Sequence, residues 1–259
     1  MPHPQNSHQE LSLYSHIPPA RQPQILRIIS GVTGMLPENS LNHHLVYKPK
    51  RPKQFGPGAG AELYYVQLVS EVDEEAAKER PDEPYAVRKQ KWRMKLEDLP
   101  EVTRKPVTSR SVLSANFGEG DALALVDSLG YTFVSSSSLL LPMCLTAGHC
   151  RLQTAYFTRV SRLVHNNIVI TLTKILLPQA PADTSSPDAA FGSPFPWSSL
   201  APLDPAESWV LKVAVRVQSN HDVEGLNTAV NELKGFKDLL KGMCDLEVAE
   251  RLALDTRVR

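Results

Sequence analysis

The chain has 259 residues, 42% of them apolar, and its 28 lysine and arginine residues balance 28 aspartate and glutamate residues. This length allows a sizeable buried core, whereas a formal net charge of zero provides no global field that would draw the chain to nucleic acid. Cys144, Cys150 and Cys244 have no paired spacing, so we expect a reducing compartment. The amino terminus lacks the apolar core of a secretory signal and no apolar run approaches roughly 20 residues, so we expect a soluble chain.

The first part of the chain combines helical and strand patterns. Residues 1–10 are polar and are predicted to be a disordered amino terminus. Between Pro23 and Met35, apolar residues recur every three or four positions, which predicts an amphipathic helix that stops before Pro37. Alternation or a β-favouring composition predicts strands at 44–47, 62–72, 85–96, 109–115 and 131–134, with a helix at 118–130.

The last part of the chain contains the clearest strand pattern. Residues 163–177 are predicted to form one long strand, and residues 208–218 alternate strictly between apolar and polar or small side chains. Asp222 is predicted to cap a final helix that ends near Gly242. A helix, many strands, and a closing strand and helix together predict an α+β domain with a mainly antiparallel sheet, which a barrel would fit.

Four segments interrupt these patterns and are predicted to be disordered insertions in a single domain that spans residues 11–259. Their compositions differ: the first is rich in proline and lysine, the second is acidic, the third begins with a serine run, and the fourth is rich in proline. In chain order they are 48–60, 73–84, 135–161 and 178–206.

Three short patterns suggest catalytic or metal chemistry, and each has a simpler explanation. Residues 145–150 resemble the segment around the catalytic histidine of trypsin-like proteases, but no Gly-Asp-Ser-Gly-Gly segment accompanies His149, so a chance match is favoured. Alternating Glu71, Asp73 and Glu75 would share one strand face and could bind a divalent cation, although a solvated acidic loop is favoured. Adjacent His43 and His44 would point to opposite faces, so we expect one packed and one exposed imidazole and no zinc site.

A basic stripe around Trp92 is the one place where a polyanion could dock. A solvated strand face is the favoured explanation, and no glycine-rich phosphate loop accompanies it. The basic members of the stripe are Arg88, Lys89, Lys91, Arg93 and Lys95.

Three segments, in their order and spacing, resemble the subunit 18 family of the Mediator complex of RNA polymerase II transcription. The first comprises residues 10–21, the helix after them and residues 43–49; the second comprises 129–134 and 165–177; the third comprises 208–217 and the final helix. Relatives join the strand near Val134 to the strand near His165 by a short connection, whereas about 27 residues intervene here. Residues 136–159 are therefore either an insertion or translated non-coding sequence, and the sequence leaves both open.

The resemblance implies a triphosphate-tunnel-like β-barrel of the Mediator head type, with flanking amino-terminal and carboxy-terminal helices. It implies a non-catalytic nuclear coactivator subunit that helps to bridge gene-specific regulators and RNA polymerase II. The implied partners are subunit 20, as a heterodimer, and a carboxy-terminal helix of subunit 8, with the rest of the head and the polymerase contacted indirectly. It implies no cofactor, metal, catalytic residue, membrane or direct nucleic-acid contact, and it leaves the interface residues unassigned.

Two other functions remain open at this stage. A tunnel-fold phosphohydrolase would use Glu71, Asp73 and Glu75 as inward-facing acids opposite Arg93 and Lys95, although no Glu-x-Glu-x-Lys strand is present. A direct nucleic-acid binder would use the basic stripe around Trp92, with an affinity that falls steeply with salt.

Overall fold

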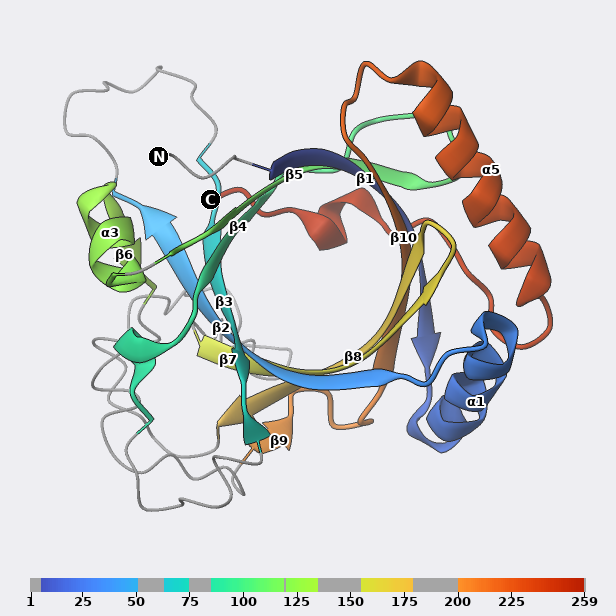
Figure 1. The fold of residues 1–259 in the computed structure, drawn as a ribbon, viewed down its shortest axis with the longest axis horizontal. Coiled ribbons are helices and arrows are strands. Elements are labelled where there is room, and N and C mark those ends of the chain that lie inside the picture. Colours follow the sequence, from blue (N-terminus) through green and yellow to red (C-terminus); the bar gives the residue numbers. More distant parts are fainter. Residues whose placement is uncertain are drawn as a thin grey trace, which may run out of the picture.

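The computed structural model describes residues 6–50, 63–74, 85–118, 120–134, 155–178 and 200–258. In this part of the chain, ten strands form one antiparallel sheet in the order β10-β1-β5-β4-β3-β2-β7-β8-β9, with β6 paired to β2. Because β10 also pairs with β8, the sheet closes into a ring that leaves out only β6 and β9 (Figure 1). The ring is irregular, since only three residue pairs join β3 to β4. The predicted α+β class with an antiparallel multi-stranded barrel is confirmed.

The strands and helices have the following bounds. The strands are β1 (Asn6–Ile17), β2 (Glu38–Pro49), β3 (Val66–Val72), β4 (Arg93–Glu97), β5 (Thr108–Asn116), β6 (Tyr131–Phe133), β7 (Ala155–His165), β8 (Ile168–Pro178), β9 (Leu200–Pro202) and β10 (Trp209–Val217). The α-helices are α1 (Gln22–Thr33), α3 (Ala122–Ser128) and α5 (Val223–Leu239). None of these helices is long and apolar enough to cross a membrane.

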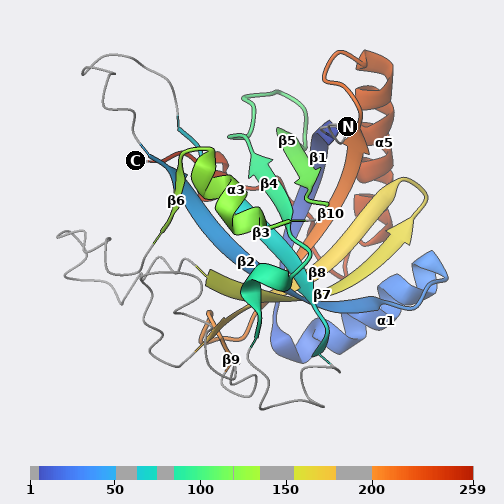
Figure 2. The same ribbon diagram turned by 60° about the vertical axis from the view of Figure 1, so that its left-hand side comes forward.

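The main hydrophobic core lies outside the ring, between the sheet and the helices. Strand alternation directs one set of side chains outward, and α5 packs on β1 and β10 while α1 packs on β7 (Figures 1 and 2). Leu13, Val213 and Leu233 are almost fully buried in this layer. A second outer cluster forms under α3 and includes Trp92 and Phe157. Hydrophobic burial therefore holds the helices against the outer surface of the sheet.

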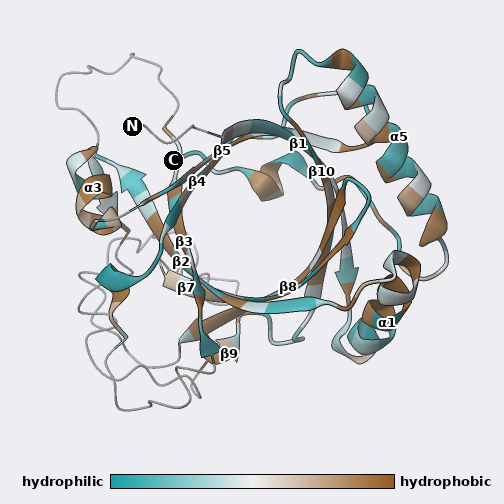
Figure 3. Cartoon of the chain, viewed as in Figure 1, coloured by the Kyte–Doolittle hydropathy of each residue, from teal (hydrophilic) through white to brown (hydrophobic). Residues whose placement is uncertain are grey.

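The inward-facing side chains of the same strands are more polar, so hydrophobic and hydrophilic residues alternate along the ring (Figure 3). The register places Glu10 between Arg110 of β5 and Arg216 of β10, and Tyr14 opposite Lys212. Paired residues of antiparallel strands project to the same face. The ring interior is consequently lined by charged and hydroxyl groups.

The carboxy-terminal segment runs along one mouth of the ring, past β1, β5 and β4 to the chain just before β3. Glu247 exchanges two backbone hydrogen bonds with Tyr14, at 2.8 and 2.7 Å. Further along, the Thr256 hydroxyl donates to the carbonyl of Glu97, and the backbone N–H of Tyr65 donates to the carbonyl of Thr256 at 2.9 Å. The carboxy-terminal segment is thus fastened by hydrogen bonds across this mouth, from β1 to the residues before β3.

Several sequence-based predictions are confirmed because their determinants are local. The first helix covers residues 22–33 and ends at Gly34, whose φ of 68° is left-handed. Asp222 caps α5 by accepting a hydrogen bond from the backbone N–H of Gly225 at 2.9 Å. The strands predicted at 109–115 and 208–218 correspond to β5 and β10.

Other predictions are wrong at specific places. The disorder predicted for residues 1–10 is contradicted for residues 6–10 by β1, which begins at Asn6 and pairs with β5 and β10, while residues 1–5 lie outside the described residues. The single strand at 163–177 is a hairpin of β7 and β8, because Asn166 adopts a φ of 52° that a turn requires and that asparagine tolerates. The start of the predicted strand at 85–96 is instead a 3₁₀ turn at Val87–Lys89.

The four predicted insertions are narrower than expected. β2 extends to Pro49, β9 occupies Leu200–Pro202, and β7 begins at Ala155. Residues 155–159 pair with β2 and, from Phe157, with β8, so they belong to the sheet and the prediction of an insertion is wrong for them. The rest of the four predicted insertions lies mostly outside the described residues, at 51–60, 75–84, 135–154 and 179–199.

Candidate functional site

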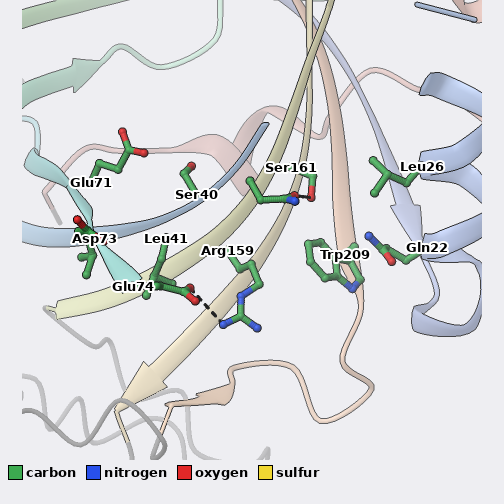
Figure 4. A pocket seen from close by; sticks show the side chains of 12 residues that line it. Gln22, Leu26, Ser40, Leu41, Glu71, Asp73, Glu74, Arg159, Ser161 and Trp209 are labelled. Carbon is green, nitrogen blue, oxygen red and sulfur yellow. Dashed lines mark hydrogen bonds and ion pairs between the residues drawn. The ribbon is translucent and has the colours of Figure 1, made fainter. Parts of the chain in front are cut away.

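A groove with a cavity of about 890 Å³ opens on the outside of the ring between α1 and the end of β3 (Figure 4). Its floor is the outer face of β2 and β7, where the register pairs Asn39 with Ser161 and Leu41 with Arg159. The remaining lining residues come from α1, β2, β10, and β3 with the residues beside it; they are Gln22, Leu26, Ser40, Glu71, Val72, Asp73, Glu74 and Trp209. A volume of this size suits a bound segment of a partner molecule.

The groove has an apolar end and an acidic end. Leu26 and Trp209 are half-buried and pack against the main core, so they present apolar surface at the end near α1. Asp73 and Glu74 lie at the other end, where the guanidinium of Arg159 donates to Glu74 at 3.3 Å, whereas Glu71 projects to the inward face of β3 (Figure 4). Because this ion pair is exposed, it contributes little to stability, and a ligand can replace it at small expense.

The ring interior contains a buried charge cluster that joins four strands. The guanidinium of Arg110 is bidentate on Glu97, with N···O distances of 2.8 and 2.9 Å, and a longer contact of 3.4 Å reaches Glu10. Lys212 donates to Glu10 at 2.6 Å, and Lys95 forms an ion pair with Glu97. These five side chains, from β1, β4, β5 and β10, are hereafter the interior cluster.

The interior cluster keeps both of its carboxylates ionised. Burial by itself would raise the pKa of Glu10, but Lys212, Lys95 and Arg110 outweigh burial and lower that pKa to about 2. Burial opposes ionisation at Glu97 in the same way, and Lys95 and Arg110 lower its pKa. Both carboxylates are therefore charged at neutral pH.

The two adjacent histidines project to opposite faces of β2, as predicted, but neither imidazole is the exposed one that we expected. His43 faces outward, stacks on Phe157 with a centroid distance of 4.5 Å and bonds the Tyr85 hydroxyl through Nδ1 at 3.1 Å. His44 faces inward, stacks on Tyr156 at 4.5 Å and bonds Thr158 through Nε2 at 2.9 Å. Burial lowers the pKa of His43 well below its usual range and, with Lys95, lowers that of His44 to about 3, so both are neutral.

The predicted basic stripe does not form one surface. Trp92 is buried and donates its indole N–H to the carbonyl of Val87 at 2.8 Å, so the ring is not available for base stacking. Arg88 pairs with Asp121 on the outside, whereas Lys95 points into the ring. The predicted exposure to solvent is confirmed for every basic member of the stripe except Lys95, but the predicted continuous strand face is wrong because the segment forms a 3₁₀ turn before β4 begins.

The structure describes only some of the other candidate site residues that the sequence predicts. Glu71 projects to the inward face of β3, as the phosphohydrolase alternative requires. On the same face, Gln67 pairs with Lys95. Glu75 and His149 lie outside the described residues. Within the described part of the chain, no group of three or more His, Cys, Asp or Glu side chains could hold a metal ion.

Comparison with known proteins first defines the class of fold. A chain in the structure of the Schizosaccharomyces pombe Mediator head module superposes with a TM-score of 0.66 at 20% identity, over 93% of this chain and 98% of that one. The ring with its outer helices is therefore the fold of a Mediator head component.

The family follows from the sequence comparisons. The model of the Med18 protein family matches residues 9–139 and 140–257, so the chain belongs to this family. Its relatives include the Mediator of RNA polymerase II transcription subunit 18 of Aspergillus oryzae, 27% identical over 96% of this chain and 99% of the relative. The subunit 18 of Yarrowia lipolytica is also 27% identical, over 97% of this chain and all of the relative. The resemblance noted in the sequence is confirmed.

The residues that sequence reasoning missed are the members of the interior cluster other than Lys95. The sequence predicts that Glu10 lies in a disordered terminus, and it predicts strands around Arg110 and Lys212 without marking either residue as part of a site. Alternation did show that Lys212 lies on the polar face of its strand, but no local pattern shows which polar faces meet. The pairing of β1 with β10 is what joins side chains as far apart in the sequence as Glu10 and Lys212.

Proposed function

We propose that the chain is a non-catalytic subunit of the Mediator head, acts in the nucleus as part of a transcriptional coactivator, and works by binding other subunits. The observation that carries this proposal is membership of the Med18 family along nearly the whole chain, together with the head-module fold. The partners proposed are subunit 20, as a heterodimer, and a carboxy-terminal helix of subunit 8. The remainder of the head and RNA polymerase II would be contacted through them.

The outer groove is the proposed seat of the subunit 8 helix. An amphipathic helix, about 10–12 Å across, would place its apolar face on Leu26, Leu41 and Trp209. Two carboxylates, Asp73 and Glu74, and one arginine, Arg159, leave the acidic end of the groove with excess negative charge, which favours basic residues on the bound helix.

Co-expression with subunits 20 and 8 of the same organism, followed by size-exclusion chromatography, tests the proposal. We expect a stoichiometric complex; a stable monomer that binds neither subunit 20 nor subunit 8 would overturn the assembly function.

A labelled peptide of the subunit 8 carboxy terminus then tests the groove. Leu26→Ser should weaken peptide binding about tenfold, because polar substitution at an apolar contact loses on the order of 1–2 kcal/mol.

Leu239→Ser is the matched control, since Leu239 is an exposed leucine of an outer helix that does not line the groove. The control should bind the peptide with wild-type affinity. Thermal unfolding of both variants verifies that each is folded at the assay temperature. Equal peptide affinities for the two variants would place the helix elsewhere on the chain.

A further inference from the structure

The apolar end of the outer groove is supported by two side chains that are not among its lining residues, Lys174 and Glu207. We propose that Glu207 holds Lys174 against the indole of Trp209, and that both are positioning residues which present this ring to the segment bound in the groove. The inference rests on the proposed function, because it takes the groove to be a binding site.

Lys174 lies in an otherwise apolar row of β8. Inward and outward residues alternate along this strand, and the outward residues Ile170, Leu172 and Leu176 are buried in the outer hydrophobic clusters. Lys174 is the next member of the same row, and its side chain is only 14% exposed. A cation in such surroundings loses hydration unless specific groups interact with it. The groups that interact with Lys174 therefore fix its position.

Lys174 interacts with one carboxylate and one aromatic ring. Its ammonium donates to Oε2 of Glu207 at 2.6 Å and lies over the ring of Trp209, 5.9 Å from the centroid. A cation at this distance is attracted to the face of an indole. Trp209 is half-buried, packs against the main core and lines the groove at the end near Leu26 (Figure 4). Lys174 thus restricts the ring that an apolar residue of a bound segment would contact.

The backbone of Glu207 has a conformation that glutamate rarely adopts, with a φ of 55° in the left-handed region. The turn around it is fixed by Asp204, whose carboxylate accepts from the backbone N–H groups of Ala206 at 2.9 Å and Ser208 at 3.2 Å. Glycine would adopt this φ without strain, but it has no carboxylate to hold Lys174. Strain of this kind is typical of positions where the side chain has a function.

The first test measures the Kd of the labelled subunit 8 peptide for variants of Lys174. Lys174→Met should raise this Kd about threefold to tenfold, the range for losing one cation–π contact. Lys174→Arg keeps a cation that can pair with Glu207 and stack on the ring, so its Kd should stay within about twofold of wild type. Lys237→Met removes an exposed lysine of α5 outside the groove and should leave the Kd unchanged.

A double-mutant cycle shows whether Lys174 acts through Trp209. Trp209→Leu alone should raise the peptide Kd at least about thirtyfold, as the loss of a central aromatic contact does. Adding Lys174→Met to Trp209→Leu should raise the Kd no further, because no indole remains for the lysine to position. Additive effects would overturn the positioning role, since they would mean that Lys174 contacts the peptide itself.

Variants of Glu207 separate peptide binding from stability. Glu207→Gln and Glu207→Gly both remove the carboxylate, and both should raise the peptide Kd about twofold to fivefold. Only glycine relieves the left-handed backbone, so Glu207→Gly should unfold at a higher urea concentration than Glu207→Gln. If the glycine variant also bound the peptide as tightly as wild type, the role assigned to the carboxylate would be wrong.

Acrylamide quenching of tryptophan fluorescence tests the position of the ring without a peptide. Lys174→Met should increase quenching, because the ammonium and its aliphatic stem no longer cover the indole. The chain has three tryptophans, so the measurement is repeated in a Trp209→Phe background, where the increase should disappear. Equal quenching of wild type and Lys174→Met would overturn the proposal.

Failure of this inference and failure of the proposed function give different results. If the wild type binds no peptide, the proposed seat of the subunit 8 helix is wrong and the positioning role is overturned with it. If the wild type binds the peptide, and Lys174→Met and Glu207→Gln bind it equally well, only the positioning role is overturned.

Discussion

Replacing Glu10 by Gln should destabilise the folded chain in a way that depends on pH. The wild-type carboxylate is buried, and its pKa falls from 4.5 to about 2 on folding. At about 1.4 kcal/mol for each tenfold change in acid strength, this difference corresponds to roughly 3 kcal/mol of folding free energy. Because the folded pKa is the lower one, the contribution is complete above pH 4.5 and is lost as pH falls towards 2.

Urea unfolding of wild type and Glu10→Gln between pH 7 and pH 2, in chloride buffers, measures this contribution. The difference in the free energy of unfolding should be about 3 kcal/mol at pH 7 and should shrink between pH 4.5 and pH 2. Glu250→Gln removes an exposed carboxylate and should show no such change. A difference that stays constant from pH 7 to pH 2 would refute the assignment of Glu10 as an ionised, paired group.

Three further substitutions test the packing and capping of the outer helices by urea unfolding at pH 7. Leu233→Ala should lose about 2–5 kcal/mol because Leu233 is fully buried between α5 and the ring, whereas the exposed Leu239→Ala should change stability by no more than about 0.5 kcal/mol; equal losses would contradict the outer core. Asp222→Ala should lose about 1 kcal/mol with its cap bond to Gly225, and an unchanged midpoint would show that the cap contributes nothing. Gly34→Ala should lose about 1–2 kcal/mol, because a Cβ there meets open space and only the left-handed backbone opposes it; a stabilising effect would contradict this backbone conformation.

The helices could be predicted from the sequence because their determinants lie within one or two turns. Pro23, Gly34 and Asp222 mark helix boundaries whatever the chain packs against. β10 could also be predicted from a local pattern, because apolar and polar residues alternate strictly along a strand that buries only one face. The hairpin of β7 and β8 was missed because two asparagines without glycine are a weak turn signal between two apolar runs.

The sites were harder to predict than the elements. The interior cluster depends on register, which places Glu10 opposite Arg110 and Arg216 across two different strand pairs. A shift of one residue in β1 would send Glu10 into the outer core and Leu11 into the ring. The groove depends on how α1 is seated beside β7, and that seating is a tertiary property without a local signal.

The pairing of β10 with both β1 and β8 has a consequence for synthesis on the ribosome. β1 is made first, yet the strand that covers one of its edges and the helix that covers its outer face follow about 200 residues later, as the separation of 202 between Glu10 and Lys212 shows. At about 5–20 residues per second, this delay lasts on the order of 10–40 s. Throughout that interval the nascent chain presents an open strand edge and uncovered leucines. We therefore expect the emerging amino-terminal half to be prone to aggregation until β10 and α5 have been made.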